Sequence, residues 1–164
     1  MYIIKSVDEL NNLIISNNNF NYNFILELLN NYKGSDWIKI IKENNICNPD
    51  PKLNGYFKKL LFKNSNFEMY LIIWFPNALT PIHNHPNNGC FVKMLDGYLI
   101  EDIYENIGYQ KAKFINSNLI NKNDINYKES NFILHQIKNI SSHNAVSLHI
   151  YLPPNFKYSI FQKI

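Results

Sequence analysis

The spacing of hydrophobic positions changes roughly a third of the way along the chain. Three segments of the first part carry apolar side chains three and four positions apart, which is the spacing of one helix face: residues 6–15, 20–32 and 35–45. Ser6 and Ser35 stand where N-caps belong, and Glu9 follows Ser6 as in a capping box. The prolines between positions 47 and 55 then break helicity. We therefore expect helices over about residues 1–50.

The rest of the chain consists of short apolar segments separated by Asn, Gly, Pro and Asp. These segments are rich in β-branched and aromatic residues, which favours strands. They span residues 56–62, 67–75, 89–95, 97–105, 109–115, 131–139 and 145–152. Many short strands at near-regular spacing are typical of a sandwich or barrel. We expect a mainly β protein of one domain, residues 1–164, in which a short helical cap precedes a barrel that begins at about residue 55.

Composition narrows the functional classes. A chain of 164 residues, 46% of them hydrophobic, can bury the core of one domain. The net charge is only +3 and every basic residue is a scattered Lys, which does not indicate nucleic-acid binding. The chain has no apolar run of membrane-spanning length and no signal-peptide pattern. We expect a cytoplasmic protein without nucleic-acid or membrane partners, in which Cys47 and Cys90 stay reduced rather than form a disulfide.

All five histidines lie in the predicted β part, which makes a metal site the first candidate for chemistry. His83 and His85 are separated by one residue. In an extended segment both imidazoles leave the same face, about 7 Å apart along the strand, while Asn84 leaves the other. Two such imidazoles can converge on one ion. The pair alone also fits two histidines near a loop that bind nothing.

A second polar row lies in the last long predicted strand. Ser147, His149 and Tyr151 alternate with apolar residues, so the strand period puts the three polar groups on one face. If that face points into the barrel, its groups must bond to one another or to a ligand. His149 could then bridge the two hydroxyls and orient the phenol. The alternative is a row that faces solvent on the outer surface.

The spacing after the histidine pair matches a known motif. Four residues lead from His85 to Cys90, and six more lead to Gly97. This arrangement resembles the first motif of the cupin superfamily, in which the cysteine's place is usually taken by a glutamate ligand. Asn77 stands where that motif begins with Gly.

The second cupin motif is matched at its end, where three residues separate His135 from Asn139. Its Pro-x-Gly is absent. The usual set of three histidines and a carboxylate therefore becomes three neutral histidines. The nearest acids downstream, Glu101 and Asp102, fall past the turn at Gly97.

Three separated segments together resemble cysteine dioxygenase, a thiol dioxygenase of the cupin superfamily. They are "HNHPNNGCFVKMLDG", "LHQIKN" and "VSLHIYLPP". The resemblance covers residues 56–154 and extends weakly into the N-terminal helices. It implies a cupin barrel, also called a double-stranded β-helix or jelly roll, with a helical cap. It also implies a monomeric enzyme that uses O2 to oxidise L-cysteine to cysteine sulfinic acid.

The same resemblance assigns roles to single residues. It implies iron(II) held by His83, His85 and His135. It implies a thioether crosslink between Cys90 and Tyr151, with Tyr151 acting beside the iron and positioned by His149 and Ser147. The bond between Leu152 and Pro153 falls where the family has a cis peptide. The alternative for Cys90 is a small buried thiol.

The substrate site departs from the family. The family binds the substrate carboxylate with an arginine two residues after a tyrosine, and here Tyr56 and Lys58 occupy these places. Lysine offers a point charge without the bidentate fork. The substrate could therefore be another small thiol, such as 3-mercaptopropionate, cysteamine or a peptide's N-terminal cysteine, and Lys58 could also be an ordinary surface lysine. A non-catalytic metal-binding cupin is the alternative from another class. A sugar isomerase or germin-like oxidase is disfavoured, because both usually need the missing glutamate.

Overall fold

The computed structural model describes residues 2–17, 21–46, 55–86, 88–128 and 133–164. The chain forms two compact units, residues 1–48 and 49–164. None of the helices in the described ranges is both long enough and apolar enough to cross a membrane. Cys47 lies outside the described residues.

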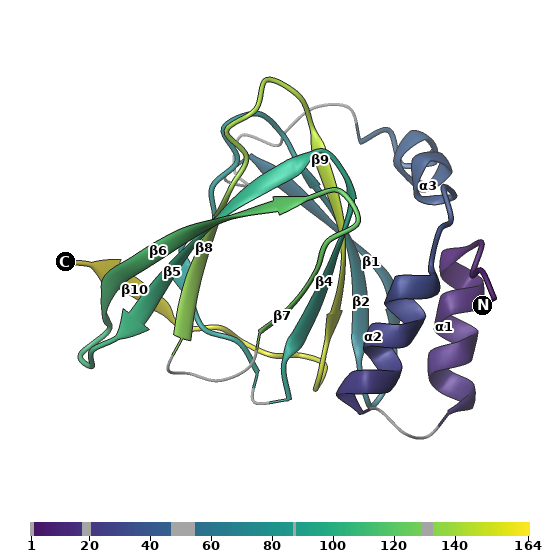
Figure 1. The fold of residues 1–164 in the computed structure, drawn as a ribbon, viewed down its shortest axis with the longest axis horizontal. Coiled ribbons are helices and arrows are strands. Elements are labelled where there is room, and N and C mark those ends of the chain that lie inside the picture. The colour runs from purple at the N-terminus through teal and green to yellow at the C-terminus, as the bar shows by residue number, and fades with distance from the viewer. Residues whose placement is uncertain (1, 18–20, 47–54, 87, 129–132) are drawn as a thin grey trace. The chain divides into compact units, whose positions relative to one another are not determined.

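The first unit contains the three predicted helices (Figure 1): α1 (Val7–Ser16), α2 (Tyr22–Asn31) and α3 (Trp37–Glu43). The predicted cap at Ser6 is confirmed, since its side chain accepts a hydrogen bond from the Glu9 backbone at 3.1 Å. Asn21 caps α2 in the same way. The apolar faces of α1 and α2 are buried, as their spacing predicts, at Val7, Leu10, Ile14, Ile25, Leu28 and Leu29.

The predicted cap at Ser35 is wrong. The N-cap of α3 is Asp36, which makes no side-chain cap bond. Its carboxylate instead accepts hydrogen bonds from the Val7 backbone and from the Tyr32 hydroxyl, both at 2.8 Å. A contact 29 residues away along the chain thus outcompetes the local cap.

The second unit contains the strands. They are β1 (Tyr56–Lys63), β2 (Glu68–Trp74), β3 (Ile82–His83), β4 (Cys90–Asp96), β5 (Tyr98–Asn106), β6 (Lys111–Asn121), β7 (Ile125–Lys128), β8 (Ile133–Lys138), β9 (Ala145–Tyr151) and β10 (Ile160–Lys163). All seven predicted strands are present. The strands that the sequence did not reveal are β3, β7 and β10, which have two, four and four residues and so show no measurable period.

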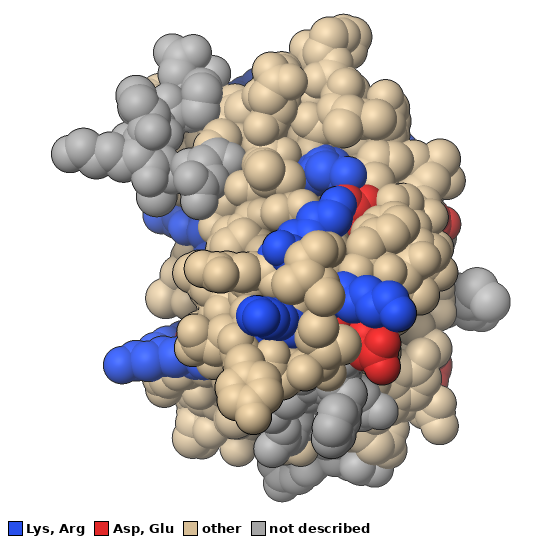
Figure 2. All heavy atoms as spheres, turned by 90° about the vertical axis from the view of Figure 1, so that its left-hand side faces the viewer, with Lys and Arg blue, Asp and Glu red and all other residues tan. Residues whose placement is uncertain are grey.

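The strands form two groups that face each other across the unit (Figure 1). One is the five-stranded antiparallel sheet β1-β2-β9-β4-β7, and the other runs β10-β3-β8-β5-β6 and is closed by the parallel pairing of β10 with β6. This arrangement confirms the prediction of a mainly β, double-stranded β-helix. On the outer surface, Figure 2 shows lysine and acidic side chains close together on one face. In the second group, Lys138 of β8 pairs with Asp102 of β5 at 2.6 Å.

Two turns at the cupin motif keep their backbone conformation here, one with the motif's glycine and one with Asn in its place. Gly97 joins β4 to β5 at φ +70°, and a Cβ there would lie 3.0 Å from the Cβ of Ala145. Both the dihedral and the close approach therefore require glycine. Asn77, which replaces the motif's first glycine, also has positive φ, at 65°. Asn tolerates this conformation better than other non-glycine residues, so the turn is kept.

The core between the sheets is formed by residues of both groups, with Ile72, Trp74, Ala78, Met94, Leu99, Ile120, Ile137 and Ala145 in one buried cluster. The polar cavity described below lies against this cluster, which therefore supports its walls. Met94 has no exposed surface.

Replacing Met94 by Ala tests this support. We expect Met94→Ala to lower the free energy of unfolding by about 2–5 kcal/mol, because it removes a fully buried side chain and leaves a cavity. Leu119→Ala on β6, where the side chain is 54% exposed, is the matched control and should change stability little. Urea denaturation measures both. Equal effects of the two substitutions would contradict this picture of the core.

Candidate metal centre

A cavity of about 150 Å³ opens between the two strand groups of the second unit. Its apolar walls come from core residues such as Ile72, Leu99 and Ile137. Its lining includes all but one of the residues that the sequence singled out, Tyr56, Lys58, His83, His85, Cys90, His135, His149 and Tyr151, whereas Ser147 lies behind His149. The strand period therefore brings the candidate residues of distant segments to one place.

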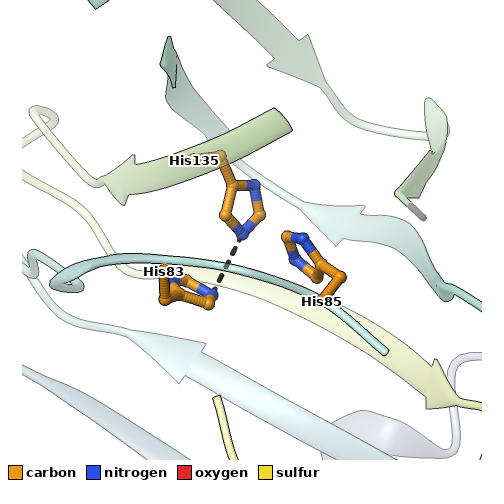
Figure 3. A group of neighbouring side chains, drawn as sticks. All are labelled: His83, His85 and His135. Atoms are coloured by element: carbon orange, nitrogen blue, oxygen red, sulfur yellow. Dashed lines mark hydrogen bonds between the residues drawn. The ribbon is translucent and has the colours of Figure 1, made fainter. Parts of the chain in front are cut away.

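The three predicted ligands converge (Figure 3). His83 ends β3 and pairs directly with His135 of β8, while His85 follows two residues after His83. The ring centroids are 4.6 Å apart for His83 and His135, and 4.2 Å apart for His85 and His135. One nitrogen of each ring lies within 4.8 Å of the others. As the period predicts, Asn84 points elsewhere, and its Oδ1 accepts a hydrogen bond from the Ser159 backbone at 2.7 Å.

The hydrogen bonds of these rings show that they suit a cation. His83 Nδ1 lies 2.9 Å from the Pro81 carbonyl, and His135 Nδ1 lies 2.6 Å from Glu101 Oε1. Each Nδ1–H therefore donates to an oxygen, which leaves a lone pair on each Nε2. Burial lowers the pKa of both rings, so they are neutral near pH 7.

The two Nε2 atoms nevertheless lie only 3.1 Å apart. At this distance the two nitrogens share either a hydrogen-bond proton or a cation, because two facing lone pairs would repel. The separation matches two nitrogen ligands that each lie about 2.1 Å from one ion. Within the described residues, His85 Nδ1 is buried without a hydrogen-bond partner, so this ring also keeps a nitrogen for a ligand. The site therefore fits a divalent metal, and imidazole ligands suit iron, zinc, copper and nickel alike.

Sequence reasoning missed a buried carboxylate beside this site. Glu101 is 1% exposed and accepts a hydrogen bond from His135, while Lys128 Nζ lies 3.0 Å from its other oxygen. Burial raises the pKa of Glu101, and the neighbouring Lys128 opposes that rise. The alternation of β5 places Glu101 and Ile103 on one face, and Ile103 pairs with His135. The sequence signal that could have revealed Glu101 is an acidic residue at an inward-facing position of a largely apolar strand.

The polar row on β9 faces inward, so the solvent-facing alternative is wrong. Ser147 Oγ accepts a hydrogen bond from Trp74 Nε1 at 2.8 Å and lies 2.8 Å from His149 Nε2. Trp74 can only donate, so the Ser147 hydroxyl keeps its own proton for His149 Nε2, and in that arrangement the proton of His149 sits on Nδ1. The Tyr151 hydroxyl lies 3.4 Å from that Nδ1. A directed chain of hydrogen bonds thus runs from Trp74 to Tyr151, and Trp74 had not been predicted as part of it.

Cys90 lies opposite Tyr151 in the register of β4 and β9. Its thiol hydrogen-bonds with the Tyr151 hydroxyl and lies 3.9 Å from His149 Nδ1. Burial raises the pKa of Cys90 to about 12, although the charge of Lys58 opposes that rise. The free thiol is therefore protonated near neutral pH, and it touches the phenol that the resemblance pairs it with.

The two residues expected to bind a carboxylate also reach the cavity. Tyr56 packs on Trp74 with ring centroids 5.2 Å apart. Lys58 is exposed as a whole residue, but its ammonium lies over the ring of Tyr151, 4.3 Å from the centroid. Desolvation lowers the pKa of Lys58, and Cys90 and Glu68 oppose this effect. Lys58 is thus placed beside the predicted catalytic tyrosine.

The segment after β9 contributes residues that the sequence did not suggest. Tyr158 lines the cavity with its ring centroid 5.1 Å from that of His83, and Phe156 lines it as well. The Leu152–Pro153 peptide is cis, as the resemblance implied. No periodic pattern could mark these residues, because they belong to an irregular segment.

Comparisons with known proteins identify the relatives of this chain. The sequence model of the family described as cysteine dioxygenase type I matches residues 8–163. Cysteine dioxygenase type 1 of Homo sapiens is 32% identical over 94 residues, which are 56% of this chain and 47% of that protein. The chain thus spans about half the length of this relative. The Danio rerio protein of the same name is 26% identical over 86% of this chain and 70% of its own length.

Solved structures show the same fold at low identity. An oxalate oxidase in complex with the substrate analogue glycolate superposes with a TM-score of 0.52 at 16% identity, covering 67% of this chain and 57% of its own. A Klebsiella pneumoniae protein with a double-stranded β-helix domain gives a TM-score of 0.55 at 12% identity. That match covers 73% of this chain and 94% of the other. These likenesses establish the barrel type.

Substituting Glu101 tests its part in the metal centre. We expect Glu101→Gln to weaken cobalt(II) binding about tenfold, because the ligand His135 loses a charged hydrogen-bond partner. Glu105→Gln, an exposed position on the same strand, should leave affinity unchanged. Competition with a coloured chelator measures both affinities. Unchanged binding by Glu101→Gln would show that the carboxylate does not support the site.

Proposed function

The chain belongs to the cysteine dioxygenase type I family, and from this membership we propose that it is an iron-dependent dioxygenase that oxidises L-cysteine to cysteine sulfinic acid. The observation that carries the proposal is the cluster of three neutral imidazoles beside a small cavity that is also lined by Lys58, whose ammonium has no ion pair among the described residues. The reaction adds both atoms of one O2 to one thiol. It therefore balances without a further reductant.

The three histidines His83, His85 and His135 would hold the metal. Bound there, iron(II) would supply the redox chemistry that O2 requires and a charge that favours a deprotonated substrate thiol. Because all three ligands are neutral, they leave that charge undiminished. Glu101 would keep the ring of His135 in the tautomer that presents Nε2 to the metal.

The remaining residues would bind and orient the substrate. Lys58, with Tyr56 beside it, would pair with the carboxylate. Tyr151, whose hydroxyl lies 3.4 Å from His149 Nδ1 and hydrogen-bonds with the Cys90 thiol, would turn its phenol toward the substrate. A cavity of about 150 Å³ lies below the roughly 300–1,000 Å³ of pockets for drug-sized ligands, which favours a small thiol. Positioning is thus the protein's main contribution.

The proposal includes a monomeric, cytoplasmic enzyme whose reactants are a small thiol and O2, without nucleic-acid or membrane partners. The family and the net charge of +3 support it. The position of Lys58 favours thiols that carry a carboxylate, such as cysteine or 3-mercaptopropionate, over cysteamine. A metal-binding cupin without activity is the second candidate, because the imidazole cluster alone would suffice for it.

Oxygen uptake tests the activity. Protein reconstituted with iron(II) should consume O2 and cysteine in equal amounts and form the sulfinate, detected by chromatography. We expect His135→Ala to lose this activity with its metal, whereas His143→Ala, an exposed position, should keep it. If the loaded protein takes up no O2 with cysteine, 3-mercaptopropionate or cysteamine, the non-catalytic candidate is the correct one.

Mass spectrometry tests the crosslink that we propose between Cys90 and Tyr151. Their register pairing and hydrogen bond support a bond between Cys90 Sγ and a ring carbon of Tyr151. Its formation removes two hydrogens, with O2 as the oxidant. After turnover with iron, the intact chain should be lighter by these hydrogens, and Cys90→Ser should not be. A mass that never changes, together with a free thiol at Cys90, would contradict the crosslink.

A further inference from the structure

Lys58 is held in the cavity by aromatic rings rather than by a carboxylate. Its ammonium lies 3.9 Å from the ring centroid of Tyr70 and 4.3 Å from that of Tyr151. No ion pair among the described residues uses Lys58. Ring faces attract a cation without neutralising it. The positive charge is therefore fixed in place and still available to an anion.

Tyr70 is itself held on two sides. It lies on β2 opposite His149 of β9, so its side chain is on the same face of the sheet as the cavity residues. Its hydroxyl donates a hydrogen bond to Glu68, which is 5% exposed and also lies 3.8 Å from Lys63 Nζ. Its ring meets that of Tyr151 edge-on, with centroids 5.9 Å apart. These contacts leave the Tyr70 ring little freedom to turn away from Lys58.

A lysine at this place needs such support. An arginine presents a rigid, planar fork that docks a carboxylate with two parallel bonds, whereas a lysine ends in a point charge on a flexible stem. An unsupported ammonium would have to be ordered by each arriving substrate, which weakens binding. Two ring faces that order it beforehand remove that cost. The charge of Glu68 also favours the protonated form of Lys58, against the effect of desolvation.

We propose that Tyr70, oriented by Glu68, is a positioning residue that holds the Lys58 ammonium over the cavity and makes the site select thiols that carry a carboxylate. This inference rests on the proposed function and extends it by naming the substrate class. It assigns a task to a tyrosine that touches neither the metal ligands nor the reacting sulfur.

Thiol binding to cobalt(II)-loaded protein without O2 tests the proposal apart from catalysis. The probes are 3-mercaptopropionate, which has a carboxylate and no amine, and cysteamine, which has an amine and no carboxylate. Binding is followed by the thiolate-to-cobalt absorption. We expect Tyr70→Leu to raise the Kd of 3-mercaptopropionate about tenfold, because a cation–π contact is lost, and to change that of cysteamine less than about twofold. Lys58→Met should show the same selective loss.

Two further variants separate positioning from folding. Tyr70→Phe keeps the ring and loses only the bond to Glu68, so its selectivity should lie between those of wild type and Tyr70→Leu. Tyr109→Leu removes a tyrosine that is 98% exposed and should match wild type. The proposal is overturned if Tyr70→Leu weakens both thiols equally, if it weakens neither, or if wild-type protein does not prefer the carboxylate.

The thiol-binding experiment can succeed or fail independently of the oxygen-uptake experiment. Wild-type protein that binds 3-mercaptopropionate selectively, and loses this selectivity in Tyr70→Leu, supports the positioning role even if no O2 is consumed. In active protein, Tyr70→Leu should raise KM for cysteine about tenfold and leave kcat within about twofold, because it affects carboxylate binding. A fall in kcat at constant KM would overturn the proposal.

Discussion

The approach of two histidine nitrogens to 3.1 Å is the constraint on which the rest of the site depends. The opposite ring nitrogens lie within hydrogen-bond distance of the Pro81 carbonyl and the Glu101 carboxylate, so each Nδ1–H can donate to an oxygen and leave a lone pair on Nε2. The closeness of the two nitrogens is set by the backbone, since His83 and His135 are direct partners in the pairing of β3 with β8. The fold thus holds two imidazole nitrogens close enough to share one proton or one cation. Such a site is organised for its ligand before the ligand arrives.

The polar groups that surround this contact are hydrogen-bonded to one another. Every inward polar group of β9 has a partner, so the cost of burying it is offset by hydrogen bonds. The two lysines that line the cavity belong to the same sheet but differ in their partners: Lys128 on β7 pairs with Glu101 beside His135, whereas Lys58 on β1, at the other edge of the sheet, has no ion pair among the described residues. In the proposed function, a thiol that carries a carboxylate would place its sulfur near the three imidazoles and its carboxylate near the unpaired Lys58. The two ends of the cavity therefore differ in chemistry, which favours one orientation of a bound ligand.

Much of the fold and part of the site could be predicted from the sequence. Period-two alternation in β9 identified the inward row at Ser147, His149 and Tyr151, and the single-residue spacing identified the pair at His83 and His85. These features are local to one strand. The residues that were missed, Glu101, Trp74 and Tyr70, act through neighbours on other strands. Their partners depend on strand order and register, which hydrophobic spacing does not encode. The missed strand β3 is too short to show a period.

The carboxyl-terminal strand β10 pairs with the short strand that carries the candidate ligand His83. Ile160 of β10 pairs with His83, and Asn84 binds the backbone of Ser159, so β10 flanks the two-residue strand β3 on the side away from β8. Docking of β10 and alignment of His83 are therefore linked equilibria, and a ligand that favours one favours the other. Metal binding at the histidines would therefore slow hydrogen exchange of the backbone amides in β10. By the same linkage, a fusion partner that strains those residues would lower the affinity for the metal.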